Sequence, residues 1–424
     1  MPRRSALLAS AVSAVALATG VTLAAAPTQA ASGAARATPV PTHFAVSGSG
    51  FGTRVGGGAL PTGSSPTAYQ RIGCTNKAGL VRTNDLAEQE IPGVGTLSGL
   101  RTRIWTTRHH GVVASHARHR IARLALVDTP LGSLAVTGIT SEVTAFHDST
   151  GFHTATSSTL GGISITPVIG PVQTLPLPTP GQPVSIPGVA TVSIGPGTAH
   201  SGAHGAVVSA FALRVDLPQS DTHVKLARSH ATIADGVSFG LFHGRSSATR
   251  VSALDHTLTS GPNPLTVMPC QGTGGHAHGK TLADVDLAGL AVVHGLTSRN
   301  RAGQTRARAH GYETGKVGRV NLGGGALVVD AIVGRAAVTR TAQGITRTAK
   351  GTSVGKITVN GVVRRFPRTG VLEIPGVAKL EERIVHRTRT GLSVTALRIT
   401  LLDGTGAVID LGQAQLSISK SRAR

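Results

Sequence analysis

Apolar and polar residues alternate along most of this chain. Clear examples are SLAVTGITSEVTAF (133–146), ALVVDAIVGRAAVTRT (326–341) and TGLSVTALRITLLD (390–403). A period of two residues places one set of side chains on a buried face and the other in solvent, so these segments predict β-strands. The region 101–128 is ambiguous, because Ile121, Leu124 and Val127 could also form the apolar stripe of a helix.

Turn signals separate the predicted strands. The phrase IPGV occurs at 91, 186 and 374. Proline followed by glycine suits the two central positions of a type II turn, so each copy is expected to join two strands. The segment 170–183, GPVQTLPLPTPGQP, has no strand alternation and cannot donate a full ladder of hydrogen bonds, which predicts a loop.

The chain contains an internal duplication. At a shift of 196 residues, positions 53–100 align without a gap to positions 249–296, with identical pairs such as Thr53/Thr249 and Cys74/Cys270. Twelve positions are identical, where chance would supply roughly four at this composition. The sequence therefore predicts an all-β protein of two similar sandwich-like or barrel-like modules, spanning 43–234 and 235–424.

The N-terminal segment has the features of a secretory signal peptide. Two arginines precede an apolar stretch from Ala6 to Ala26, and small residues around Ala30 suit a signal peptidase, so residues 1–30 are expected to be removed and 31–42 to form a flexible linker. No other window has the 18 or so apolar residues of a membrane span. We expect a protein that is secreted or associated with the cell surface.

The charge is strongly basic. Lys and Arg total 41 against 19 acids, a net charge of +22, and removing the signal takes two of these charges (Arg3 and Arg4) to leave +20. Outside a cell such a surface attracts anionic wall polymers, lipid headgroups and nucleic acid alike. Aromatic residues are only 3%, which argues against sugar platforms and base-specific grooves, and Trp105 is interpreted as a half-buried strand residue.

Two motifs suggest enzymes, and neither is well supported. GGHAHGKT (274–281) matches the phosphate-binding loop G-x-x-x-x-G-K-[ST], but LADVDLAGLAVVHGL follows it and alternates like a strand, where that loop needs a helix. GVSFG (236–240) matches the serine-hydrolase elbow around Ser238, without a visible strand-turn-helix. An extracellular hydrolase remains the alternative function.

Histidines offer a weak metal hypothesis. His276 and His278 would share one face of a strand, with Cys270 nearby, yet the first module has no such histidines and solvated loop residues are the favoured interpretation. The cluster RHHGVVASHARHR (108–120), which includes His116 and His119, is interpreted as basic surface. The sequence predicts no catalytic residue, metal ligand or cofactor.

The two cysteines occupy equivalent positions in the two modules. Export makes a disulfide between Cys74 and Cys270 chemically reasonable, and closing so long a loop would stabilise the fold by about 5 kcal/mol. Two buried thiols, or a bridge between molecules, are the alternatives. The internal bridge is the favoured interpretation.

Several motifs together resemble the choice-of-anchor P family of exported actinobacterial proteins. They are the export signal, SGSGFGTRV, PTAYQRIGCTNKAG, the IPGV turns and the PC-x-GTGG phrase around Cys270. The resemblance covers about 44–420 and implies an extracellular region with varied C-terminal anchors, although no anchor is recognisable at the end of this sequence. We expect a secreted or surface-associated structural or binding protein with a basic surface that contacts anionic envelope polymers.

Overall fold

Strands make up nearly all the regular structure of the described residues. The computed structural model describes residues 38–57, 66–91, 95–129, 132–186, 190–218, 221–253, 258–287, 291–402, 404 and 406–421. Within them, the one helical element is the 3-10 helix η1 (Gly323–Gly325), and none is a helix long and apolar enough to cross a membrane. The predicted signal peptide lies outside the described residues, and strand β1 begins at Val40, so the last three positions of the predicted linker belong to a strand.

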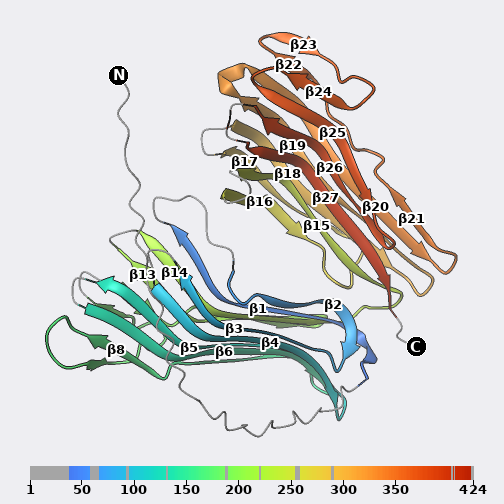
Figure 1. The fold of residues 1–424 in the computed structure, drawn as a ribbon. Coiled ribbons are helices and arrows are strands. Elements are labelled where there is room, and N and C mark those ends of the chain that lie inside the picture. Colours follow the sequence, from blue (N-terminus) through green and yellow to red (C-terminus); the bar gives the residue numbers. More distant parts are fainter. Residues whose placement is uncertain are drawn as a thin grey trace, which may run out of the picture. The chain divides into compact units, whose positions relative to one another are not determined.

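The first half of the chain forms two antiparallel sheets (Figure 1, blue to green). The β14 sheet has the order β10 (Val184–Ile186), β11 (Ala190–Ser193), β13 (Gly205–Leu217), β14 (Thr222–Ala234), β1 (Val40–Gly57) and β2 (Gln70–Ala78), with β12 (Thr198–Gly202) also paired to β13. The β5 sheet has the order β3 (Val81–Ile91), β4 (Gly95–His109), β5 (Val112–Thr129), β6 (Gly132–Asp148), β8 (Gly162–Thr166) and β9 (Gln173–Leu175), with β7 (Gly151–Thr159) also paired to β6.

The second half forms two further sheets (yellow to red). The β27 sheet has the order β16 (Leu258–Val267), β15 (Gly240–Ala253), β27 (Val408–Lys420), β26 (Gly391–Leu401), β25 (Ala378–Arg387) and β24 (Val371–Ile374). The β19 sheet has the order β17 (Ala277–Asp286), β18 (Ala291–Gln304), β19 (Arg308–Leu322), β20 (Leu327–Thr341), β22 (Ile357–Val359) and β23 (Val362–Arg364), with β21 (Ile345–Thr348) also paired to β20.

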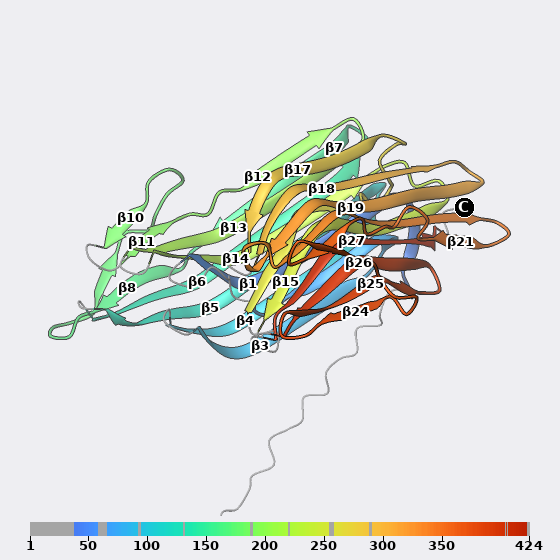
Figure 2. The ribbon, with the colours of Figure 1, turned by 90° about the horizontal axis from the view of Figure 1, so that it is seen from above.

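The strand order of the first two sheets recurs in the second two. In each half the first strand pairs with the last, as β1 pairs β14 and β15 pairs β27. The next strands then form a meander in the facing sheet, β3 to β6 in one half and β17 to β20 in the other; Figure 2 shows β3 to β6 lying side by side. The described strands give open sheets rather than closed barrels, so of the two predicted architectures the sandwich-like one is observed. The region 101–128 falls in β4 and β5, which resolves the ambiguity in favour of strands.

Each half encloses two apolar clusters between its sheets. In the first half one cluster is centred on residues such as Leu97, Leu124 and Leu226, and the other on residues such as Ile104, Val143 and Val208. All six are no more than 1% exposed and come from both sheets. Burial of these side chains is the main force that holds the two layers together.

In each half the two sheets approach each other closely between the two apolar clusters, and we refer to this region as the waist. In the second half, backbones of the two sheets meet there: a Cβ on Gly334 would lie 1.7 Å from the carbonyl oxygen of Gly412, and one on Gly315 would lie 2.1 Å from that of Ser247. In the first half the waist is polar instead, and the Ser229 hydroxyl donates to the Ser141 carbonyl across it at 2.9 Å. Glycine or a small polar residue is needed where sheets approach so closely.

The turns agree with the sequence where they are described. At the third IPGV, Ile374 pairs with Ala378, the Val377 amide donates to the Ile374 carbonyl, and Gly376 has a φ of 71°. The first two copies each contain residues outside the described part. Their first residues, Ile91 and Ile186, are described and pair with Gly95 and Ala190, the residues that follow each phrase. The proline-rich segment 170–183 contains only the short strand β9 and one isolated bridge.

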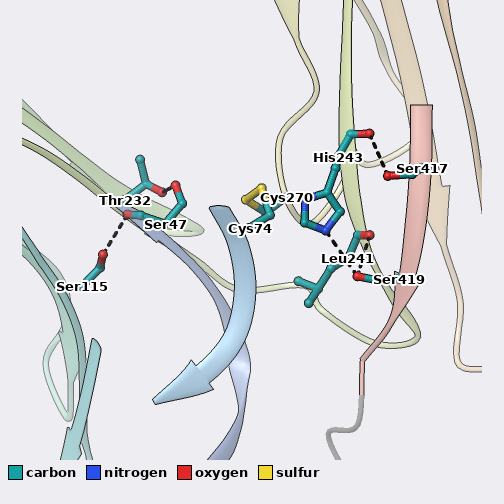
Figure 3. The surroundings of a disulfide bond; sticks show 9 residues. All are labelled: Ser47, Cys74, Ser115, Thr232, Leu241, His243, Cys270, Ser417 and Ser419. Atoms are coloured by element: carbon teal, nitrogen blue, oxygen red, sulfur yellow. Dashed lines mark hydrogen bonds between the residues drawn. A yellow bond between two sulfur atoms is a disulfide. The ribbon is translucent and has the colours of Figure 1, made fainter. Parts of the chain in front are cut away.

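The two cysteines of the chain lie at disulfide distance. Cys74 on β2 and Cys270 after β16 have their Cα atoms 5.3 Å apart and form an intrachain disulfide (Figure 3). Cys270 packs against a small apolar cluster that includes Leu241, and its carbonyl accepts from the amide of Phe242. Of the three interpretations of the cysteines, the internal bridge is the one found in the structure.

Candidate anion-binding surface

The outer face of the β5 sheet carries four arginines in two directly opposed pairs. Cross-strand register places Arg103 opposite Arg118, and Arg101 opposite Arg120. The alternation of β4 and β5 turns these side chains outward, because their neighbours along the strands, such as Ile104, are buried in the core. We refer to Arg101, Arg103, Arg118 and Arg120 as the arginine ladder.

The ladder has more positive charge than its neighbours neutralise. Arg101 pairs with Asp85 at 3.3 Å, and Arg118 pairs with Glu142. Arg103 and Arg120 form no salt bridge to any described residue. Like charges directly opposite each other on a sheet destabilise it, so an anion bound between the paired strands would remove an existing repulsion as well as add its own attraction.

Trp105 lies at one end of the ladder and is already covered. Its ring stacks on the imidazole of His116, with centroids 4.7 Å apart and an interplanar angle of 6°, while the Arg103 guanidinium lies 5.0 Å from the indole centroid. The prediction of a half-buried strand residue is confirmed. Because His116 and Arg103 already contact the ring, Trp105 helps to fix the position of Arg103 and is not free to stack on a ligand.

His116 is held neutral at physiological pH. Burial lowers its pKa to about 4, Glu142 opposes this effect, and Arg103 adds to it. Both ring nitrogens are hydrogen-bonded to hydroxyls, at 3.0 Å from Thr107 and 2.9 Å from Thr144. The histidine is therefore a fixed support for Trp105 rather than a further positive charge.

The equivalent face in the second half has a different charge pattern. Arg299, the counterpart of Arg103, lies opposite Thr314, and Thr314 lies opposite Arg335, so a threonine separates the cations. The guanidinium carbon of Arg335 lies 4.1 Å from the centroid of the Tyr312 ring and covers that ring. Directly opposed arginines are thus a feature of the first half, even though both faces are basic.

The two enzyme motifs lack the geometry that their chemistry needs. The second half of GGHAHGKT lies in strand β17, and the next described element along the chain is strand β18 rather than a helix. Ser238 is exposed in the loop before β15, where the backbone amides of Ser238, Phe239 and Gly240 all donate to the side-chain oxygen of Gln304. No described histidine or carboxylate is hydrogen-bonded to its hydroxyl.

His276 and His278 are the histidines considered as metal ligands. His276 and His278 are exposed, and the sulfur of Cys270 is taken up by the disulfide. Within the described ranges no three His, Cys, Asp or Glu side chains are grouped to hold a metal ion.

The assignment of His119 to the basic surface is wrong. Its side chain is fully buried, because β5 turns it inward with Ala117 and Ile121. The Thr102 hydroxyl donates to the Ala68 carbonyl at 2.6 Å, so the ring Nδ1, 2.6 Å from that hydroxyl, must carry the proton. Burial lowers the pKa of His119 to about 3, and the ring is a neutral part of the waist.

A buried carboxyl in the second half is not apparent from sequence patterns. Glu313 on β19 is fully buried, accepts a hydrogen bond of 2.7 Å from the Ser246 hydroxyl, and leaves Oε1 without a partner. Burial raises its pKa to about 8, against the opposing effect of the bond from Ser246. The equivalent position of the first half, 196 residues earlier, is Ala117. This difference between the two copies is the sequence signal that could have drawn attention to Glu313.

Comparison with known proteins gives no match. No protein-family model matches the chain, and no curated protein matches it either. The case for a function therefore depends on the charges and contacts described above.

Proposed function

We propose that this chain is a secreted or cell-surface-associated binding protein whose arginine ladder contacts anionic polymers of the cell envelope. The observation that carries the proposal is the direct opposition of Arg103 with Arg118 and of Arg101 with Arg120, with two of the four arginines lacking a carboxylate partner among the described residues. A polymer with regularly spaced negative charges would place its anionic groups along these rows. The resemblance to the choice-of-anchor P family supports the same compartment and is itself part of the proposal.

The ladder suits a polymer better than a small ligand. Its arginines lie on the outer face of two neighbouring strands, β4 and β5, and three of the four side chains are exposed. Guanidinium groups pair well with phosphate and carboxylate oxygens, and their attraction is screened over about 8 Å at physiological ionic strength. Each contact is weak in salt, so useful affinity requires several at once, as a polymer provides.

Binding of the mature chain to isolated anionic cell-wall material across a salt series tests the proposal. We expect the logarithm of the binding constant to fall linearly with the logarithm of the salt concentration. The double substitution Arg103→Gln/Arg120→Gln is expected to reduce the magnitude of the slope by about two, one for each lost contact.

The duplication supplies a matched control. Arg299→Gln/Lys316→Gln removes the same two charges at the equivalent positions of the second half, and it is expected to have a smaller effect on both slope and affinity. Equal losses for the two variants would show that affinity follows net charge alone and would contradict a role for the ladder.

A further inference from the structure

The outer face of the β14 sheet contains a pocket that is separate from the ladder. Its volume is about 390 Å³, and its lining includes Phe51, Arg54, Phe211, Lys225 and Arg228. Strands β1, β14 and β13 supply these side chains in two adjacent cross-strand rows. We refer to it as the β14 pocket.

One row consists of three cations. Arg54 lies opposite Lys225, and Lys225 lies opposite Arg214. Arg214 is neutralised by Asp216 at 2.8 Å, and Asp216 is also paired with His223, which lines the pocket. Arg54 and Lys225 form no salt bridge to a described residue, so the row retains a net positive charge toward the pocket.

The second row holds a further guanidinium between two phenylalanines. The Arg228 guanidinium carbon is 5.6 Å from the ring centroid of Phe51 and 5.7 Å from that of Phe211. Its Nε is buried and has no hydrogen-bond partner, and it too forms no salt bridge to any described residue. Burial, together with the charge of Arg54, lowers the pKa of Arg228. The aromatic rings therefore hold in place a cation that has no protein counter-ion among the residues described.

The second half shows what the same row is like when its charges are balanced. At the equivalent register Arg250 lies opposite Asp410, and Asp410 lies opposite Arg398. Asp410 binds Arg398 through both carboxylate oxygens, at 2.8 and 3.2 Å. The fold thus accommodates a carboxylate where the first half has Lys225, and an accumulation of cations is no requirement of the architecture.

The aromatic row also differs between the halves. Ser247, Gln413 and Thr395 occupy the register positions of Phe51, Arg228 and Phe211. The Ser247 hydroxyl donates to the side-chain oxygen of Gln413, and the Gln413 side-chain amide donates to Asp410. A charged group that lacks a protein partner is found only in the first of these two equivalent rows.

We propose that the β14 pocket binds a phosphate group. Arg54, Lys225 and Arg228 surround one space with two planar guanidiniums and one ammonium, and a tetrahedral anion has enough oxygens to bind all three. A carboxylate is planar and carries a single charge, so it matches three cations less well than a phosphate, whose oxygens point in four directions and which can carry a second charge. The rings are covered by Arg228 and Lys225, so the charged group itself, rather than an aromatic or sugar portion, is what the pocket recognises.

Calorimetric titration of the mature chain with inorganic phosphate at low ionic strength tests this inference, with chloride as the balancing anion. We expect saturable binding, and a melting temperature that rises with phosphate concentration. Lys225→Asp, which introduces the residue of the second half, is expected to weaken phosphate binding about tenfold or more. It should also raise the melting temperature without phosphate, because the row becomes neutralised.

The controls separate this site from the rest of the surface. Arg250→Gln, at the position equivalent to Arg54, and the ladder variant Arg103→Gln/Arg120→Gln should each bind phosphate as the unmodified chain does. Retained binding in the ladder variant also makes the test independent of the proposed function. The absence of saturable binding, unchanged affinity in Lys225→Asp, or equal affinity for acetate and phosphate would each overturn the inference.

Two further titrations identify the source of the phosphate. Tighter binding of a phosphodiester polymer than of inorganic phosphate would assign the pocket to a polymer, and tighter binding of inorganic phosphate or of glycerol phosphate would assign it to a small ligand. Either result supports phosphate recognition by the β14 pocket.

Discussion

Replacing the buried Glu313 with glutamine should change how the stability of the protein depends on pH. The folded chain raises the pKa of this carboxyl from 4.5 to about 8, because its charged form is buried. At pH 7 Glu313 is therefore protonated in the folded state and ionised in the unfolded state. The resulting contribution to stability is fully present below pH 4.5 and is lost as the pH rises through 8.

The size of the effect follows from the interval between the two pKa values. Each pH unit above 4.5 costs about 1.4 kcal/mol until the folded carboxyl also ionises, so the loss at pH 7 is about 3 kcal/mol. Glutamine has nearly the same shape and does not titrate. We expect the free energy of unfolding of Glu313→Gln, relative to the unmodified chain, to increase by about 3 kcal/mol between pH 4 and pH 7.

Urea denaturation at a series of pH values from 4 to 8.5 measures this difference directly. Glu373→Gln is the matched control, because it makes the same chemical change at an exposed position of the same half. The control should show no comparable pH dependence. A difference between Glu313→Gln and the unmodified chain that stays constant from pH 4 to pH 7 would refute the reasoning, whatever its sign.

Three further changes have distinct expected outcomes. Cys270→Ser should lower the free energy of unfolding by about 5 kcal/mol in denaturant titrations, since the bridge closes a loop of 196 residues; an unchanged midpoint would contradict this. Acidification should quench the fluorescence of Trp105, the single tryptophan, with a midpoint near pH 4 as His116 becomes charged, and His116→Gln should abolish that transition. Gly334→Ala should cost about 3 kcal/mol or more in thermal unfolding because its methyl group meets the facing sheet, whereas Gly73→Ala, where the nearest heavy atom is 4.0 Å away, should be tolerated.

Local patterns in the sequence predict the elements well, because a strand is specified by neighbours two residues apart. The alternation in segments such as 133–146 and 326–341 corresponds to β6 and β20, and the third IPGV forms the turn that its proline and glycine require. Equivalence of Cys74 and Cys270 under the internal shift also favours the bridge that the structure contains. These inferences need only local chemistry or a comparison of the two halves.

Register between strands could not be predicted in the same way. Alternation indicates that Arg103 and Arg118 each face outward from a strand, but only the pairing of β4 with β5 places them opposite each other. The sequence around His119 does not indicate its burial, because its neighbours in sequence are mostly polar and its burial depends on strands far along the chain. Glu313 likewise lies at a position whose burial is fixed by the facing sheet. Both the arginine ladder and the β14 pocket depend on such long-range pairing.

Arginine-specific chemical labelling with and without bound wall polymer tests the central claim most directly. Mass spectrometry would compare the modification of Arg103 and Arg120 with that of Arg299, the counterpart of Arg103 in the second half. If the ladder contacts the polymer, Arg103 and Arg120 will be protected at low salt, this protection will disappear as salt rises, and Arg299 will be modified throughout. Equal labelling of the ladder in free and polymer-bound protein would contradict the account.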